Sequence, residues 1–207
     1  MIKTIAIDLG GVYFTKGTEV FVEKIHKSLK LPKQKIAEIF EGSQMKEGYL
    51  YRKGKLTKNQ FWKLAIKKLN LSQEDIPKLQ KLWHSSYKLN KSISNLTNKL
   101  RKHYLVVAFS NTIKERVDYL EKKYHFKENF DALFFSYIYK LTKFEKKFYK
   151  ILLEKTHSKP GECLYIDDKL YNLKLAKSLG INTIWFKNLA QLIKELKKRN
   201  IIKAQDL

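Results

Sequence analysis

From Leu105 onward the sequence alternates between short apolar runs and longer segments with helical periodicity. This alternation is typical of β-α-β units, in which consecutive strands are parallel and helices connect them across a sheet. The apolar, β-rich runs are residues 4–7, 105–109, 133–138, 163–166 and 183–186, and the helical segments are 113–123, 145–156, 170–179 and 189–198. The sequence therefore predicts an α/β fold whose parallel sheet combines the N-terminal run with the C-terminal half of the chain.

The segment between the first two apolar runs contains no strand pattern and is far longer than a crossover connection needs. It carries helix-start signals instead. We expect Thr18 to cap a first helix, and the pairs Thr57–Gln60 and Ser72–Asp75 to form capping boxes or near versions of them. An insertion with helices only predicts a small bundle mounted on the sheet.

The chain is therefore expected to contain two units, a core of residues 1–14 and 91–207 and an inserted helical unit of residues 15–90. The inserted unit carries aromatic side chains that could line a substrate pocket. Their helical spacing favours the interior of the bundle instead. These aromatic residues are Phe40, Tyr49, Tyr51, Phe61 and Trp62.

Polar residues follow the predicted strands at the points where the strands end. The first run ends at Asp8, before Gly10 and Gly11; the second is followed by Ser110 and Asn111; the fourth ends at Asp167 and Asp168; and Lys143 follows the third. Because the carboxyl ends of parallel strands face one crevice, these residues are expected to be neighbours in space. Each alone could be a turn or cap residue. Their joint order at the strand ends indicates a functional site.

Three carboxylates at one edge would repel each other unless a positive charge lay among them. Mg²⁺ supplies that charge, since it prefers oxygen ligands and tolerates carboxylates together with a substrate phosphate. Ser110, Asn111 and nearby main-chain amides can donate to phosphoryl oxygens, and Lys143 can neutralise their charge. Asp8 is then positioned as a nucleophile toward phosphorus. The glycines after it allow close backbone approach to a ligand.

Four stretches together resemble the haloacid dehalogenase-like hydrolase superfamily: IAIDLGGV, LVVAFSNT, FDALFFSYIYKLTKFEKKFY and CLYIDDKLYNLKLAKSLGINTIWF. The resemblance implies a Rossmann-like core with an inserted helical cap. It also implies Mg²⁺-dependent hydrolysis of phosphate esters through an aspartyl-phosphate. Asp8 would be the nucleophile, Ser110 and Lys143 phosphate binders, and Asp168 a metal ligand with Asp167 nearby. The adjacent aspartates argue against the dehalogenase branch, which needs no metal.

Two positions depart from the family pattern. Most family phosphatases have a second aspartate two residues after the nucleophile, which protonates the leaving group, whereas this chain has Gly10. The main-chain carbonyl of Gly10 can still bind metal. The Asp-Leu-Gly motif resembles a branch that includes sugar-phosphate phosphatases. Phe144 replaces the usual proline after the family lysine, so Lys140 is an alternative to Lys143 for that role.

The net charge of +23 could attract nucleic acid, anionic lipid or a phosphorylated metabolite. Nearly all of it comes from lysines along helical faces, whereas nucleic-acid surfaces usually combine arginine with stacking aromatics. A dedicated nucleic-acid role is therefore not favoured. The five histidines, which show no metal-ligand spacing, are interpreted as surface or packing residues: His26, His84, His103, His125 and His157.

One cysteine, Cys163, excludes an internal disulfide. No signal-like segment or membrane-length apolar run is evident, so a cytoplasmic protein is expected. The predicted function is Mg²⁺-dependent hydrolysis of a small phosphomonoester, a sugar phosphate or similar metabolite. The alternative is a catalytically weakened relative with a binding or regulatory role, nucleic-acid association included, in which Gly10 marks the lost acid.

Overall fold

The strands form one parallel sheet. The computed structural model describes residues 1–41 and 46–202, and their five strands follow the order β3-β2-β1-β4-β5 with every neighbouring pair parallel. The strands are β1 (Thr4–Ile7), β2 (Leu105–Ser110), β3 (Ala132–Phe135), β4 (Cys163–Asp167) and β5 (Asn182–Trp185). Because β1 is central, its C-terminal end lies between the ends of β2 and β4.

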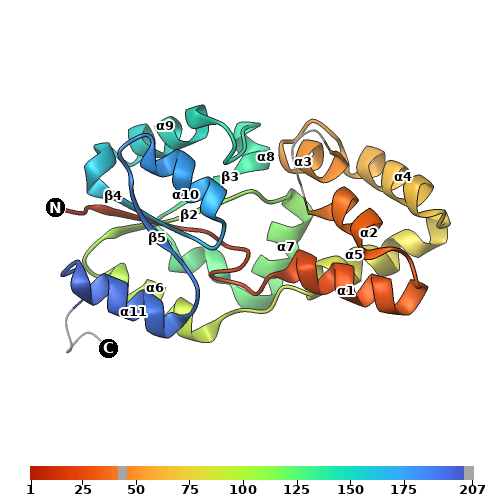
Figure 1. Cartoon of the computed structure of the whole chain (residues 1–207), viewed down its shortest axis with the longest axis horizontal. Helices are drawn as coiled ribbons and strands as arrows, with labels where there is room; N and C mark the ends of the chain where they lie inside the picture. The colour runs from red at the N-terminus through yellow and green to blue at the C-terminus, as the bar shows by residue number, and fades with distance from the viewer. Residues whose placement is uncertain (42–45, 203–207) are drawn as a thin grey trace.

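The helices cover both faces of this sheet and extend beyond it at one end (Figure 1). Helices α1 to α5, between β1 and β2, gather beyond the strand ends, where Figure 1 draws them on the right. The α-helices are α1 (Gly17–Leu29), α2 (Lys33–Phe40), α3 (Glu47–Arg52), α4 (Lys58–Leu69), α5 (Ile76–Ser85), α6 (Lys91–Leu100), α7 (Lys114–Tyr124), α8 (Ser136–Tyr139), α9 (Lys146–Lys155), α10 (Leu170–Lys177) and α11 (Leu189–Lys198). Short 3-10 turns lie at η1 (Gln73–Asp75), η2 (Phe126–Asn129) and η3 (Pro160–Glu162).

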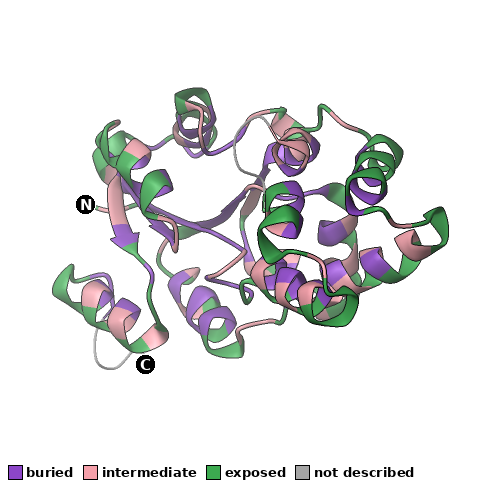
Figure 2. Ribbon diagram, turned by 45° about the vertical axis from the view of Figure 1, so that its right-hand side comes forward, coloured by how far each residue is buried: buried purple, intermediate pink, exposed green. Residues whose placement is uncertain are grey.

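Alternation along the strands divides the core into two clusters. In β1, Ile5 and Ile7 belong to the cluster that includes side chains of α6, α7 and α11, whereas Ala6 belongs to the cluster with α9 and α10. Successive strand side chains point to opposite faces, so a strand buried on both sides needs a continuous apolar run. Figure 2 shows the result as buried strands and helices that bury only their inward sides.

The α/β fold with a parallel sheet and an all-helical insertion is confirmed by this architecture. The predicted strand over residues 133–138 was wrong beyond Phe135, because α8 begins at Ser136. The Ser136 hydroxyl accepts from the Thr112 amide at 3.0 Å and lies 2.7 Å from the Arg52 carbonyl oxygen, to which it can donate. These contacts turn the chain out of the sheet, although the following aromatic and β-branched residues favour a strand.

Of the helix caps predicted in the insertion, one is confirmed and another was wrong. Thr57 and Gln60 form the expected capping box at α4. The expected cap by Thr18 was wrong, since α1 begins at Gly17 and its N-cap residue, Lys16, makes no side-chain cap. The Thr18 hydroxyl instead lies 2.7 Å from the Tyr87 hydroxyl and accepts from Trp83 Nε1 at 3.1 Å. A tertiary contact has replaced the local one.

Aromatic packing stabilises the helical insertion. Phe40 contacts the rings of Phe61, Trp62 and Trp83, and Tyr51 stacks on Phe61 at 4.5 Å between ring centroids. Such ring pairs contribute roughly 0.5–1.5 kcal/mol each beyond the area that they bury. The interior position expected for Phe40, Tyr51, Phe61 and Trp62 is therefore observed, while the partly exposed Tyr49 contacts Phe144 of the sheet unit.

The chain enters and leaves the helical insertion through two adjacent segments. The main-chain amide of Asn90 donates to the carbonyl oxygen of Tyr13 at 3.0 Å, and that of Thr15 donates to the carbonyl oxygen of Lys88 at 2.9 Å. Phe14 and Leu89 form an antiparallel bridge between these two hydrogen bonds. The two connections are thus held together beside the C-terminal end of β1. The proposed units of residues 15–90 and of 1–14 with 91–207 meet here; residues 42–45 and 203–207 of those units lie outside the described residues.

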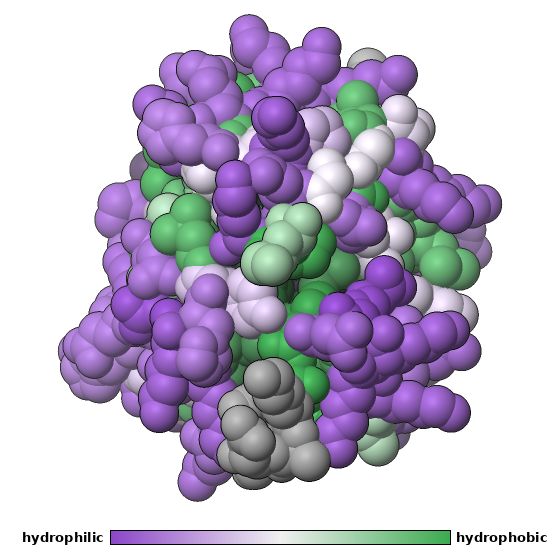
Figure 3. All heavy atoms as spheres, turned by 90° about the vertical axis from the view of Figure 1, so that its left-hand side faces the viewer, coloured by the Kyte–Doolittle hydropathy of each residue, from purple (hydrophilic) through white to green (hydrophobic). Residues whose placement is uncertain are grey.

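The surface is largely hydrophilic. Figure 3 shows one face covered mainly by hydrophilic side chains, with apolar residues visible near the centre and in smaller scattered patches. On α11, for example, Lys197 and Lys198 are exposed while Leu192 and Leu196 are buried. This is the distribution expected for lysines on solvated helical faces. Among residues 1–41 and 46–202, none of the helices has the length and apolar character that crossing a bilayer would require.

Candidate active site

The strand ends bring the predicted site residues together at one edge of the sheet. The parallel register pairs Ile7 with Ala108 on one side and with Ile166 on the other. Asp8 therefore emerges between the end of β2 and the Asp167 end of β4. Buried oxygens of Asp8, Asp167 and Asp168 lie within 4.8 Å of one another. The three carboxylates expected to converge do so.

Lys143 lies among these carboxylates. Its Nζ atom donates to Asp8 Oδ1 at 2.6 Å and to Asp167 Oδ2 at 2.8 Å. The main-chain amide of Lys143 donates to Asn111 Oδ1 at 2.9 Å, so Asn111 fixes the loop that presents this lysine. Lys140 is exposed at the end of α8. Of the two lysines considered, Lys143 is the one in contact with Asp8.

Asp167 and Asp168 are adjacent in sequence but differ in their surroundings. Asp167 accepts hydrogen bonds from Tyr165, from Asn172 Nδ2 at 3.0 Å and from the Lys169 amide at 2.7 Å. These donors satisfy a carboxylate that is completely buried. Asp167 is therefore a fixed partner of Lys143 rather than a free ligand.

The buried oxygens of Asp168 have no hydrogen-bond partner among the described residues. Lys16 Nζ and Lys169 Nζ form ion pairs with Asp168 Oδ2 at 3.3 Å and 3.6 Å, which offset part of its charge. A carboxylate left in this state costs free energy unless a further positive group approaches it. The oxygen-only donor set of Asp8 and Asp168 fits a hard divalent cation.

Gly11 makes room for this carboxylate. Its φ of +100° lies in the region that glycine adopts easily, and a Cβ atom built there would lie 2.5 Å from Asp168 Oδ2. Gly10 differs, because a Cβ at Gly10 would meet only Tyr87 Cε1, at the ordinary distance of 3.4 Å. The first-motif loop thus requires glycine at position 11 but tolerates a side chain at position 10.

Burial and neighbouring charges shift the ionisation of the cluster. Desolvation raises the pKa of Asp8 to about 7, with Asp167 and Asp168 adding to the rise and Lys143 opposing it. Burial alone would lower the pKa of Lys143, but the Asp167 and Asp8 carboxylates raise it above its usual value. The pKa of Asp168 is also raised, chiefly by burial. A cation bound here would oppose the rise in the pKa of both Asp8 and Asp168.

Asp8 should consequently make the stability of the metal-free protein depend on pH. Its pKa is about 7 when folded against a model value of 3.8, so between these values the folded state binds more protons than the unfolded state. The free energy of unfolding must fall as pH rises through this window. We expect Asp8→Asn, which keeps the Lys143–Asp167 pair, to be more stable than the wild type above pH 7. The free energy of unfolding of Asp8→Asn should exceed that of the wild type by up to a few kcal/mol, because each unit of pKa difference between the folded and unfolded states corresponds to about 1.4 kcal/mol.

Urea unfolding of the wild type and of Asp8→Asn, in the presence of a chelator and across this pH range, measures the difference between their free energies of unfolding. It should vanish below the unfolded-state pKa, where both forms of Asp8 are protonated. A stability difference that does not change with pH would contradict the expectation.

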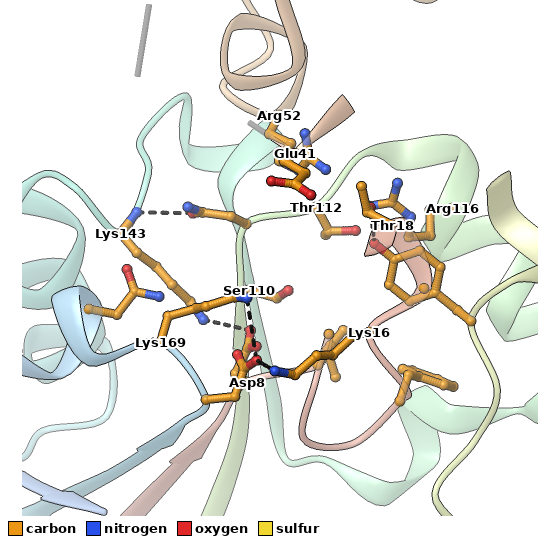
Figure 4. Close-up of a pocket in the computed structure, with 18 of the residues that line it drawn as sticks. Asp8, Lys16, Thr18, Glu41, Arg52, Ser110, Thr112, Arg116, Lys143 and Lys169 are labelled. Carbon is orange, nitrogen blue, oxygen red and sulfur yellow. Dashed lines mark hydrogen bonds and ion pairs between the residues drawn. The ribbon is translucent and has the colours of Figure 1, made fainter. Parts of the chain in front are cut away.

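A cavity of about 440 Å³ opens in front of the carboxylates, between the sheet and the inserted helices. Asp8, Gly10, Ser110, Asn111, Lys143 and Asp168 all line it. Figure 4 shows Asp8, Lys16 and Lys169 at one end of the cavity and Arg52, Thr112 and Arg116 toward the other. Lys16, Arg52 and Arg116 were not predicted as site residues, because none belongs to a strand-end motif. Thr112 directly follows Ser110 and Asn111 at a strand end, but no role was predicted for it.

The parallel sheet, the strand-end carboxylates and the helical insertion define an α/β protein with a candidate catalytic site at the carboxyl ends of its strands. The chain belongs to the haloacid dehalogenase-like hydrolase family, whose sequence model matches residues 18–186. A putative uncharacterized protein of Dictyostelium discoideum is 30% identical over 209 residues, which cover 87% of this chain and 89% of that protein. The match therefore extends over nearly the whole of both chains.

Solved structures show the same fold. A HAD family enzyme from Bacteroides thetaiotaomicron, in complex with magnesium and inorganic phosphate, superposes with a TM-score of 0.75 and 26% identity, covering 93% of this chain and 99% of that chain. L-2-haloacid dehalogenase from Xanthobacter autotrophicus, with chloropropionic acid covalently bound, gives a TM-score of 0.67 at 13% identity, covering 98% and 85%. At that identity the second similarity shows the fold alone.

Proposed function

We propose that this protein is a Mg²⁺-dependent phosphatase that hydrolyses a small phosphomonoester through an aspartyl-phosphate on Asp8. The observation that carries the proposal is the convergence of the Asp8, Asp167 and Asp168 carboxylates within 4.8 Å of one another. Among the described residues, Asp168 accepts no hydrogen bond and is offset only by ion pairs to Lys16 and Lys169. Such a cluster of carboxylates favours a site for a divalent cation over the site of a metal-free dehalogenase. The magnesium and phosphate in the similar Bacteroides enzyme support the same interpretation.

The residues present fit a magnesium ion. Asp8, Asp168 and the main-chain carbonyl of Gly10 would hold it, with Asp167 nearby as the partner of Lys143. A bound Mg²⁺ would supply positive charge that offsets the carboxylates and the phosphoryl oxygens.

The remaining chemistry belongs to the side chains of this chain. A carboxylate oxygen of Asp8 attacks phosphorus, and the bond from phosphorus to the ester oxygen breaks as that oxygen leaves as an alkoxide, which takes a proton from water. Water then attacks the phosphorus of the aspartyl-phosphate, which releases inorganic phosphate and restores Asp8. Lys143, 2.6 Å from Asp8, neutralises charge on the phosphoryl oxygens in both steps. Ser110 and the Asn111 region would donate to those oxygens, and Gly10 and Gly11 let the main chain approach them.

The inserted helices would close the cavity over the substrate. Ion pairs join the two units at its rim, from Lys53 to Glu145 at 2.8 Å and from Lys169 to Glu19 at 2.8 Å. Closure would exclude water from the aspartyl-phosphate until hydrolysis and would select the group attached to phosphate. In this proposal residues 15–90 act as the cap, and residues 1–14 and 91–207 as the catalytic core.

Gly10 favours one rival function. Without a carboxyl group at this position no residue of the first motif can protonate the leaving group, as expected of a relative that binds a phosphorylated partner without fast turnover. The strong positive charge would assist such binding, nucleic acid included.

Turnover of p-nitrophenyl phosphate separates these functions, because its leaving group needs little protonation. We expect p-nitrophenol release to require Mg²⁺ and to fall by at least about 10²-fold after chelation, since the ion stabilises several kcal/mol of developing charge. Chloride release from 2-chloropropionate in chelator would instead indicate a dehalogenase. Absence of both activities, together with salt-sensitive retention of DNA or RNA, would favour the binding role.

A further inference from the structure

Arg116 is a buried cation with no ion-pair partner in the described part of the chain. It lies on α7, is only 3% exposed, and lines the cavity. Its Nε and Nη2 atoms have no hydrogen-bond partner, and within residues 1–41 and 46–202 it forms no ion pair. Buried charges are normally paired, because removing them from water is costly. The missing partner calls for an explanation.

Two aromatic rings hold this guanidinium in place. Its central carbon lies 4.4 Å from the ring centroid of Trp83 and 4.4 Å from that of Tyr87. The hydroxyl of Tyr87 lies 2.7 Å from that of Thr18, and its ring packs so closely on Gly17 that a Cβ there would lie 2.1 Å from it. Cation–π contacts fix the position of the guanidinium but leave its charge uncompensated.

Arg52 adds a second buried positive charge at the same end of the cavity (Figure 4). Its Nη1 and Nη2 atoms donate to the carbonyl oxygens of Gly48 and Phe40 at 2.9 Å and 2.7 Å. Like Arg116, it has no ion pair within the described part of the chain. Burial, together with the charge of Arg52, lowers the pKa of Arg116 to about 10. The two cations therefore repel each other across this end of the cavity.

The nearby acidic side chains do not neutralise this pair. Glu115 accepts a hydrogen bond from the Tyr51 hydroxyl at 2.7 Å. Glu41 lines the cavity beside Arg52 but is exposed to solvent (Figure 4). Neither forms an ion pair with Arg52 or Arg116. His84 stacks on Trp83, and burial together with the charge of Arg116 lowers its pKa to about 3. His84 is therefore neutral and does not change the charge of this region.

We propose that Arg116, supported by Arg52, binds a second anionic group of the substrate, at the opposite end of the cavity from Asp8. This inference rests on the proposed phosphatase function and narrows it. The substrate is then a phosphomonoester that also bears a carboxylate or a second phosphate. Both groups share the oxyanion chemistry that a guanidinium recognises through paired N–H donors. One anion sits at the carboxylate cluster and the other at the arginines.

Matched substrates test the proposal. Propyl phosphate, 3-(phosphonooxy)propanoate and propane-1,3-diyl bisphosphate share a carbon chain and differ only in the distal group; the two- and four-carbon series extend the span. We expect kcat/KM to be at least about tenfold higher for a doubly anionic compound than for the alkyl phosphate, which is about the effect of one charge-assisted hydrogen bond. The doubly anionic compound with the higher kcat/KM identifies the second anionic group as a carboxylate or a phosphate.

Variants then assign the preference to Arg116. Arg116→Gln should remove the preference while changing kcat/KM for propyl phosphate by less than about threefold, and Arg116→Lys should retain part of it. Arg101→Gln is the matched control, because Arg101 is partly exposed and pairs with Asp131 away from the cavity. An equal loss on all three compounds would show a structural role and overturn the proposal.

Binding to Asp8→Asn gives a readout that needs no turnover. Calorimetry with the same compounds should show tighter binding of a doubly anionic compound to Asp8→Asn. The double variant Asp8→Asn/Arg116→Gln should no longer show this preference. Equal affinity for all three compounds would overturn the second anion site. Retained preference in a protein without phosphatase activity would instead sink the proposed reaction and leave the anion site standing.

Discussion

Replacing Asp8 by asparagine should abolish Mg²⁺-dependent phosphatase activity. The amide keeps the shape of the side chain but cannot form the covalent phosphoryl intermediate, so kcat for p-nitrophenyl phosphate should fall by more than about 10⁴-fold, as losses of nucleophiles do in other enzymes. The fold should remain, because Asp167 still pairs with Lys143 at 2.8 Å. Circular dichroism and unfolding curves would establish that the loss is chemical.

Asp118→Asn is the matched control for this variant. Asp118 lies on the surface of α7 and pairs with Lys114 one turn away, and it does not line the cavity. Its replacement should leave kcat unchanged. Comparable turnover by Asp8→Asn and the wild type would rule out Asp8 as the nucleophile.

Restoring an aspartate at position 10 should accelerate the hydrolysis of alkyl phosphates. General acid catalysis contributes about 10²- to 10⁴-fold, and the gain should be largest for alcohols with a high pKa and small for p-nitrophenyl phosphate. The main chain at position 10 has room for a Cβ atom, which would meet only Tyr87, at 3.4 Å. Activity on each leaving group can be compared between wild type and Gly10→Asp.

Gly10→Asn separates proton transfer from packing. The asparagine has almost the same size but cannot protonate an alkoxide, so it should show none of the gain. If both variants behave alike, the missing carboxyl group is not what limits turnover, and another residue must supply the proton.

The sheet could be predicted because strands buried on both faces need continuous apolar runs, and such runs stand out in a lysine-rich chain. The run at residues 4–7 matches β1 residue for residue, and Leu189–Lys198 matches α11. The error at residues 133–138 arose from a tertiary contact. The Ser136 hydroxyl bonds to main-chain groups of Thr112 and Arg52, which no local pattern reveals.

The carboxylate cluster could be anticipated because parallel strands bring their ends to one place, whatever their separation in sequence. The far end of the cavity could not, since its residues come from helices whose relative placement depends on packing. Arg116 did leave one signal: it precedes Leu120 by four residues and so shares the buried side of α7. An arginine on an apolar helical face, in a chain with few arginines, indicates a buried cation.

Main-chain hydrogen bonds between Tyr13 and Asn90 and between Thr15 and Lys88 hold the start and the end of the helical insertion side by side. Its two junctions are neighbours, so helices can be lengthened, exchanged or grafted between them without shifting the register of β1 against β2 and β4. Selectivity can thus diversify on one side of this junction while the reaction chemistry on the other stays constant.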